Sequence, residues 1–149
     1  MSKNYNGVTF YIVNGEAAVT DCDTSLTSVT IPDTVKSVPV TRISGAFAEC
    51  SKLTEIVLPE TINYIGEKSF YNCRNLRSVN IPSAVTYIGS YAFYNCDYLT
   101  SVTFPKNVTT VEAHMFDSCL RFANVYFEGE ITSIGEMAFR GCSKTSRIA

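Results

Sequence analysis

Six cysteines and a single histidine are the residues of this chain whose types could support chemistry. Cysteines can form disulfides, bind zinc, or act as nucleophiles beside a histidine. Cys22 stands alone, and the other five follow one another at intervals of 23 residues: Cys50, Cys73, Cys96, Cys119 and Cys142. The regular interval, more than the number of cysteines, determines which chemistry is open to them.

The interval argues against each kind of reactive site. Residues at one position of a stacked repeat have parallel Cβ vectors, whereas a disulfide needs Cβ atoms that converge to about 3.5–4.5 Å. The chain has no Cys-x-x-Cys pair and only His114 as a histidine, so zinc-ligand spacing is lacking. His114 precedes Cys119 by five residues, but in repeat register it points outward while the cysteine points into the core. We therefore expect buried, reduced, structural cysteines, with the chemistry of Cys22 left open, and no catalytic residue, cofactor or metal.

A 23-residue repeat must position these cysteines, because Phe47, Phe70, Phe93, Phe116 and Phe139 precede them at the same interval. We name the units repeat 1 to repeat 5; repeat 1 is longer and carries extra residues around Lys36–Pro39. The predicted boundaries are 26–52, 53–75, 76–98, 99–121 and 122–144. Residues 1–25 are expected to form an N-terminal hairpin cap and residues 145–149 a C-terminal tail, all within one structural domain.

Each repeat reads as a strand, a bend, a second short extended segment and a helical turn. In repeat 3, Val79 and Ile81 alternate with polar residues, which is the pattern of a strand with one buried face. Pro82 ends that strand and Gly89 marks the bend. The stretch SYAFYNC that follows has the spacing of about one helical turn packed against the core.

One such unit cannot bury its own apolar face, but stacked neighbours can. Strand-to-strand connections of this kind are right-handed in nearly all cases. The sequence therefore predicts a mainly β repeat protein, a right-handed solenoid with a parallel sheet and short helical turns between its repeats. The Asn14-Gly15 pair, flanked by apolar alternation, predicts a β-hairpin with strands near 8–13 and 16–20.

The pattern Leu-x-x-Val-x-Ile-Pro-x-x-Val-x-x-Ile-Gly-x-x-Ala-Phe-x-x-Cys resembles the BspA-like leucine-rich repeats over residues 26–144. Three positions depart from it: Glu112 replaces Gly, Met115 replaces Ala, and Glu128 replaces Pro. The resemblance implies a leucine-rich-repeat solenoid that begins with a hairpin and a longer first repeat. It also implies display on a cell surface or secretion, adhesion to host or neighbouring-cell proteins, and no catalytic activity.

Composition narrows the class of partner. The chain has 149 residues and a formal net charge of −2, and its 12 Lys and Arg are scattered, so no nucleic-acid footprint is expected. No apolar run approaches the roughly 18 residues of a membrane span, and MSKNYNGVTF has no signal-peptide stretch. Either the protein stays inside the cell, or an export signal has been removed.

Two surfaces are candidates for binding a protein partner. Positions 3 and 5 of each first strand form the strand face: Ser28, Thr30, Glu55, Val57, Ser78, Asn80, Ser101, Thr103, Asn124 and Tyr126. The second surface is rich in tyrosine, with Tyr64 and Tyr87 at one repeat position and Tyr71 and Tyr94 at another. Clustered tyrosines favour interfaces. Alternatively, they stack on one another and only stiffen the solenoid.

Two functions remain open at this point. The first is a protein–protein interaction module of a cell-surface adhesin, and the second is a structural spacer or a self-associating solenoid scaffold. The C-terminal sheet edge fits a truncated chain, end-to-end association, or closure by Thr145–Ala149 alone. Asn107-Val108-Thr109 is a glycosylation sequon that matters only if a eukaryote exports the protein.

Overall fold

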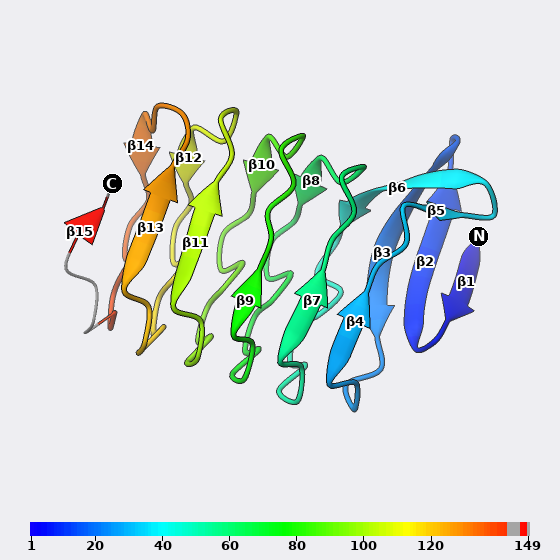
Figure 1. Ribbon diagram of the computed structural model, residues 1–149, viewed down its shortest axis with the longest axis horizontal. Helices are drawn as coiled ribbons and strands as arrows, with labels where there is room; N and C mark the ends of the chain where they lie inside the picture. The colour runs from blue at the N-terminus through cyan, green and yellow to red at the C-terminus, as the bar shows by residue number, and fades with distance from the viewer. Residues whose placement is uncertain (143–146, 149) are drawn as a thin grey trace.

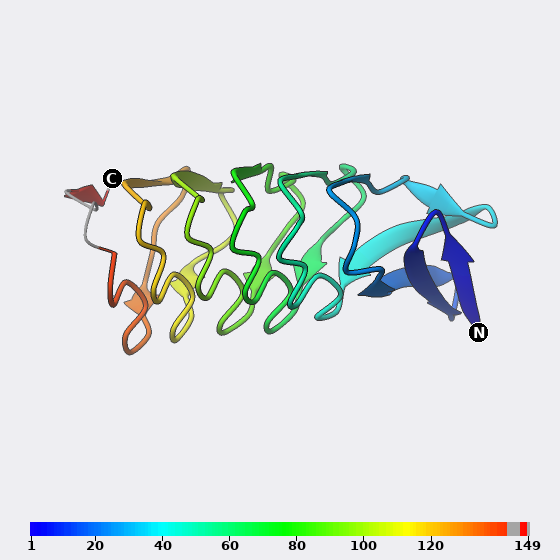
Figure 2. The same ribbon diagram turned by 90° about the horizontal axis from the view of Figure 1, so that it is seen from below.

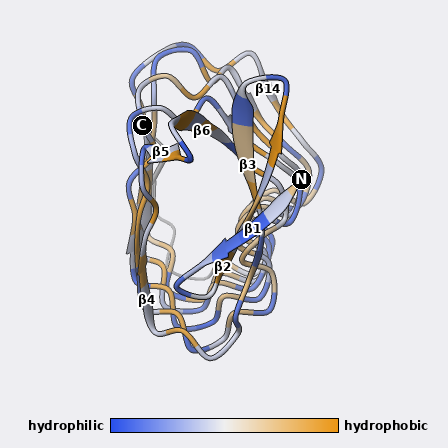
Figure 3. Ribbon diagram, turned by 90° about the vertical axis from the view of Figure 1, so that its right-hand side faces the viewer, coloured by the Kyte–Doolittle hydropathy of each residue, from blue (hydrophilic) through white to orange (hydrophobic). Residues whose placement is uncertain are grey.

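The computed structural model describes residues 1–142 and 147–148 and shows an elongated solenoid of parallel β-strands (Figure 1). Seen from the N-terminal end, the chain rises on the side of β4, crosses the top and descends on the opposite side while moving away from the viewer (Figure 3). This path is a right-handed coil, as the sequence predicted. Both of its long sides carry strands, and the core lies between them.

Two rows of strands line the solenoid, and within each row the neighbours that pair are parallel and in repeat register. We call the first row the front sheet: β4 (Ser28–Thr30), β7 (Glu55–Val57), β9 (Ser78–Val79), β11 (Ser101–Phe104), β13 (Asn124–Phe127) and β15 (Arg147–Ile148). The second row is the back sheet: β3 (Glu16–Cys22), β6 (Val38–Ile43), β8 (Tyr64–Ile65), β10 (Tyr87–Ile88), β12 (Thr110–Val111) and β14 (Ser133–Ile134).

The N-terminal hairpin forms where the Asn-Gly signal places it. Asn14 and Gly15 have φ angles of 51° and 76°, as a tight turn between β2 (Val8–Val13) and β3 requires. Asn6 and Gly7, with φ angles of 52° and 85°, make a second such turn and join a strand that the sequence analysis missed, β1 (Ser2–Tyr5). β3 also pairs in parallel with β6, so the hairpin extends the back sheet at the N-terminal end (Figure 2).

The extra residues of repeat 1 form a small hairpin of their own. β5 (Thr34–Val35) pairs antiparallel with the start of β6, and Lys36 and Ser37 turn between them with φ angles of 52° and 64°. The longer repeat is accommodated because this hairpin projects beyond the coil at its N-terminal end (Figure 2).

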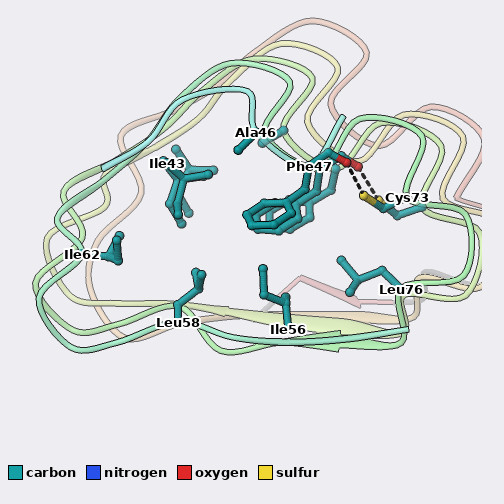
Figure 4. Close-up of a cluster of buried hydrophobic side chains, with 14 of the residues drawn as sticks. Ile43, Ala46, Phe47, Ile56, Leu58, Ile62, Cys73 and Leu76 are labelled. Carbon is teal, nitrogen blue, oxygen red and sulfur yellow. Dashed lines mark hydrogen bonds between the residues drawn. The ribbon is translucent and has the colours of Figure 1, made fainter. Parts of the chain in front are cut away.

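A column of stacked phenylalanines forms the centre of the core. Successive rings of Phe47, Phe70, Phe93 and Phe116 lie 5.5, 5.3 and 5.4 Å apart and are nearly parallel. All four side chains are fully buried (Figure 4). The ring spacing is close to the strand spacing of about 4.8 Å, so each repeat adds one ring to the stack.

The predicted helical turns are wrong. Among the described residues no segment is helical, and SYAFYNC and its counterparts are successions of tight turns. The reason lies in the main-chain hydrogen bonds, because alternate amides donate to the following repeat: Tyr91, Phe93 and Asn95 donate to Ala113, Met115 and Asp117 at 2.8–3.1 Å. Tyr91 and Asn95 therefore adopt left-handed conformations, each with φ of 60°, which a helix does not tolerate.

The strand pairing is interrupted at one place along the solenoid. In the described chain, the front sheet breaks between β9 and β11 and the back sheet between β10 and β12, both at the junction of repeats 3 and 4. The turns and the Phe93–Phe116 stack still join the two repeats there. We call this junction the seam.

Glu112 accounts for the seam in the back sheet. At the same repeat position, Gly89 and Gly135 pack so closely that an added Cβ would overlap main-chain atoms of Glu67 and Ala113. The amides of these glycines donate to Ile65 and Val111 of the preceding repeat. Glu112 has a Cβ and cannot approach Ile88 in the same way.

We therefore expect the variant Glu112→Gly to close the back sheet at the seam. The amide of residue 112 should gain the bond to the Ile88 carbonyl, and its hydrogen exchange should slow about fivefold, because a net hydrogen bond is worth about 1 kcal/mol. Glu112→Ala is the matched control, because it removes the carboxylate and keeps the Cβ. Equal protection in both variants would contradict a steric origin of the seam.

Truncation of the phenylalanine column should be costly. We expect Phe93→Ala to lower the free energy of unfolding by about 3–5 kcal/mol, because it leaves a cavity between two rings that cannot close it. Urea unfolding followed by circular dichroism measures the loss. Thr103→Ala, on the exposed strand face, should change stability by less than about 0.5 kcal/mol. A loss at Phe93 as small as at Thr103 would mean that the column does not hold the repeats together.

Candidate interaction surfaces

The strand face lies where the sequence places it, on the outer side of the front sheet. The candidates Thr30, Glu55, Val57, Asn80, Thr103 and Tyr126 are all exposed, while the alternating residues of the same strands are buried in the core or partly buried against it. On this face the side chains of Val57 and Tyr126 remain 43% and 46% exposed. The face is thus small, polar and nearly uncharged, with Glu55 as its acidic residue.

Asn80 has a structural role besides its exposure. Its side-chain Nδ2 donates to the Leu58 carbonyl at 2.9 Å, and its Oδ1 accepts from the Leu58 amide at 3.0 Å. The amide side chain thereby replaces main-chain pairing beyond the end of β9. Beside it, a groove of about 320 Å³ follows the seam across the strand face, between Ser78 and Ser101 and beneath Glu128.

The tyrosines form stacked columns, the arrangement that stiffens a solenoid. Tyr64 and Tyr87 stack at 5.1 Å, and the Arg42 guanidinium covers the free side of Tyr64 at 3.9 Å. Tyr71 and Tyr94 stack at 4.9 Å along the turns. All four are half-buried, so they present ring edges more than ring faces to solvent. Their use as a partner-binding surface stays a prediction.

A buried carboxylate, which sequence reasoning missed, continues the second tyrosine column into repeats 4 and 5. Asp117 is fully buried and accepts from Arg140 Nε and Nη2 at 3.1 and 2.8 Å, and from Ser118 Oγ at 3.0 Å. His114 Nδ1 lies 2.7 Å from Asp117 Oδ2, and the imidazole stacks on Tyr91 at 4.5 Å. One signal was available, because Asp117 and Arg140 carry opposite charges at one repeat position.

These contacts set the protonation of Asp117. Burial by itself raises the pKa of the carboxyl, but the hydrogen bonds from Arg140, His114 and Ser118, together with the Arg140 charge, outweigh burial and lower the pKa below its ordinary value. The side chain of His114 is only 14% exposed, so it is more covered than its register suggests. Asp117 holds the ring at Nδ1, and Tyr91 covers one face of the ring.

The repeating cysteines act as hydrogen-bond donors inside the core. The thiols of Cys73, Cys96 and Cys119 donate to the carbonyls of Phe47, Phe70 and Phe93 at 3.0, 3.2 and 2.9 Å (Figure 4 shows the first). Burial raises the pKa of Cys73 and Cys96 above the ordinary thiol value, so both are thiols at neutral pH.

Cys22, Cys50, Cys73, Cys96 and Cys119 form no disulfide, and the Cys22 thiol donates to the Asp23 carbonyl at 3.4 Å. A hydrogen bond with Cys50 and then burial raise the pKa of Cys22. Cys119 is buried in the core while His114 bonds to Asp117, so the structure does not join them as a nucleophile pair. Within residues 1–142 and 147–148, no cluster of three or more His, Cys, Asp or Glu could hold a metal.

The geometry has a close match among known repeats. The model of the BspA type leucine rich repeat region matches residues 15–146 in six copies. The chain belongs to the BspA-type leucine-rich repeat family. The match begins at Gly15, which fits the parallel pairing of β3 with the back sheet.

Solved structures share the fold of this BspA-type chain. A leucine-rich repeat protein from Bacteroides capillosus is 30% identical, with a TM-score of 0.75 over 86% of this chain and 99% of that one. A leucine rich cell surface protein from Faecalibacterium prausnitzii is 25% identical, with a TM-score of 0.72 over 99% of this chain and 54% of that one. The pneumococcal vaccine antigen PcpA is 18% identical, with a TM-score of 0.64 over 99% and 48%, and shows the fold alone.

The BspA-type chain spans about half the length of the Faecalibacterium surface protein. None of the curated proteins compared with it matches. In the part of the chain that the structure describes, no helix is long and apolar enough to cross a membrane. Leucine-rich repeats of this type are consistent with protein interaction or a surface role, and neighbours in the fold include surface proteins.

The Asp117 cluster predicts how stability depends on pH. Because the folded-state pKa is below the ordinary 3.8, the ionised carboxylate contributes its full stabilisation above that value and loses it as the pH falls through the folded pKa. We expect Asp117→Asn to cost about 1–3 kcal/mol at neutral pH, since Arg140 and His114 lose a charged acceptor.

The difference in unfolding free energy between the wild type and Asp117→Asn should shrink as the pH is lowered from 3.8. Urea unfolding at a series of pH values measures it. Glu130→Gln serves as the control, because Glu130 is exposed. A difference that stays constant down to the most acidic pH would show that the carboxylate charge is not what stabilises the cluster.

Proposed function

We propose that this chain is a non-enzymatic protein–protein interaction module of a cell-surface adhesin. Its partner is a protein of the extracellular matrix or of a host or neighbouring cell, and it binds through the strand face. One observation carries the proposal: Val57 and Tyr126 stay exposed on a face that is otherwise small and polar. Exposed apolar and aromatic side chains on a rigid sheet favour binding over solubility.

The chemistry of the strand face favours a protein partner. Its serine, threonine and asparagine side chains offer hydrogen bonds, and Tyr126 adds a large contact area with a polar end. Among the described residues of the five repeats, no cluster of basic residues lies on this face, which suits a protein better than a nucleic acid. Membership of the BspA-type family and the similarity to the Faecalibacterium cell surface protein support display at the cell surface.

The area of the strand face limits its affinity. The five front strands of repeats 1 to 5, at about 4.8 Å, give a length of roughly 24 Å, and a width of about 15–20 Å gives roughly 400–500 Å². A stable interface takes about 800 Å² from each partner. A single module should therefore bind in the micromolar range or more weakly, and adhesion would depend on a longer array or on many copies.

A structural spacer or a self-associating scaffold is the second candidate. The tyrosine columns favour it, because their rings stack on one another and on Arg42 instead of facing solvent. A spacer needs stiffness along the solenoid axis, and stacked rings add to it.

The first test offers the immobilised chain to a panel of extracellular-matrix and cell-surface proteins. Tyr126→Lys should lower binding at least tenfold, because it places a desolvated charge in the interface. The paired change Tyr64→Ser with Tyr87→Ser should leave binding unchanged if the strand face alone is used. Circular dichroism and melting temperature show whether each variant is folded.

The outcomes separate the two candidates. Binding that only the tyrosine variant loses would move the site from the strand face to the tyrosine columns. If neither the monomer nor a multivalent display of the chain binds any protein of the panel, the result would favour the spacer. Concentration-dependent self-association that Tyr126→Lys abolishes would favour the scaffold.

A further inference from the structure

At the N-terminal end, the solenoid has a back strand before repeat 1 but, in the described chain, no front strand. In the back sheet, β3 lies beside β6 and supplies a strand before repeat 1. In the front sheet of the described chain, β4 is the first strand and pairs with β7 alone. The place where a preceding repeat would put its front strand is thus taken by no strand of the described chain (Figure 1).

The outer edge of β4 presents main-chain hydrogen-bonding groups. Thr27 accepts from the Thr54 amide, and Ile31 donates to the Val57 carbonyl, so the odd-numbered residues face β7. Main-chain groups of alternate residues in a strand point to opposite sides. Those of Ser28 and Thr30 therefore point away from β7, toward the N-terminal end, where they can pair with another extended chain.

A hollow of about 370 Å³ lies along this edge, and we call it the β4 slot. Its walls include the edge of β4 and Pro32 on one side, and Tyr5, Val8 and Phe10 of the hairpin on the other. None of the described residues that line it is charged. Its apolar walls and its main-chain edge together suit an uncharged extended segment, with apolar side chains at alternate positions.

The hairpin wall of the slot is fixed. The Asp23 amide donates to the Gly7 carbonyl at 2.7 Å, and a Cβ added to Gly7 would lie 3.1 Å from Leu26 Cδ1. β1 and β2 cross the N-terminal end obliquely (Figure 3), so they obstruct the stacking of another whole solenoid there. A single extended segment avoids that obstruction.

We propose that the β4 slot binds an extended, uncharged segment of a partner protein, which adds as a strand to the outer edge of β4. This is β-strand addition: main-chain bonds give affinity, and alternate apolar side chains enter the hollow beside Val8 and Phe10. The slot is continuous with the strand face, because Ser28 and Thr30 belong to both. The inference rests on the proposed function and names the class of segment that the partner supplies.

The test uses the capped peptide Leu-Thr-Ser-Val-Thr-Phe-Pro, the sequence of residues 99–105, as the probe. It is uncharged and has apolar residues at alternate positions, and in this fold its strand lies parallel to a neighbouring front strand. Titrated into the full ¹⁵N-labelled chain, it should shift the amide signals of Val8, Phe10, Ser28 and Thr30. Shifts confined to another surface, or none up to millimolar peptide, would overturn the proposal.

Two matched variants test the main-chain bond. Thr30→Pro removes the outward-facing N–H and keeps the bonds to β7, a substitution that edge strands tolerate. Thr30→Val changes the side chain and keeps the N–H. The dissociation constant of the peptide should rise about fivefold in the first and less than about twofold in the second, because one net hydrogen bond is worth about 1 kcal/mol. Equal effects in the two variants would refute strand addition.

A modified peptide tests the same main-chain bonds with the wild-type chain, so the result does not depend on whether the Thr30→Pro variant folds. The peptide methylated at alternate amide nitrogens cannot complete the ladder and should bind the wild type at least tenfold more weakly. Undiminished binding of the methylated peptide would overturn the proposal. Concentration-dependent association of the chain that Thr30→Pro abolishes would also overturn it, because a second copy would then be the occupant.

The experiments can disprove the β4 slot and the proposed function independently of each other. If a surface protein binds and Tyr126→Lys abolishes binding while Thr30→Pro does not, the slot is wrong and the strand face stands. If the peptide binds the slot but no surface protein binds the chain, the adhesin function is wrong and the strand-binding edge stands.

Discussion

Main-chain hydrogen bonds that recur every 23 residues hold each repeat to the next, and their close approach decides which side chains each position accepts. Along the turns, alternate amides donate to the following repeat, as from Phe93 to Met115 and from Asn95 to Asp117. This arrangement requires left-handed residues at fixed places and leaves no room for a Cβ at Gly89 and Gly135. It also stacks the phenylalanine ring of each repeat on that of the next, and it brings each buried cysteine thiol to a phenylalanine carbonyl of the preceding repeat.

The same constraint explains where the solenoid departs from regularity. Glu112 stands at a position that the spacing reserves for glycine, and the back sheet opens beside it. The column that begins with Tyr71 and Tyr94 changes from stacked rings to the Asp117–Arg140 ion pair without a change in spacing. The hydrogen-bonded spacing therefore accepts either stacked rings or an ion pair at one repeat position, as long as each side chain interacts favourably with the one in the adjacent repeat.

A rigid spacing of this kind favours binding of partners on the outer face of a sheet or at the edge of a strand over binding of a ligand in a pocket. The front sheet offers small polar side chains on its outer face and unpaired main-chain groups at β4. Both are modest in area, so affinity depends on the number of repeats or of copies. Function in such a molecule follows from which residues occupy the few exposed columns, because the buried columns are set by packing.

The sequence by itself determined the repeat, the strand positions within the 23-residue unit, the inward and outward faces, the Asn14-Gly15 hairpin and the cysteine column, because period and alternation act locally in the chain. Only the tertiary structure decided the rest. The turns look helical in sequence, yet their amides bond to the next repeat and not within a helix. Asp117 is buried in contact with Arg140 and His114, and the β4 slot arises where the two sheets begin at different places. Each depends on which group lies opposite another across the stack, and the sequence of a single repeat does not contain that information.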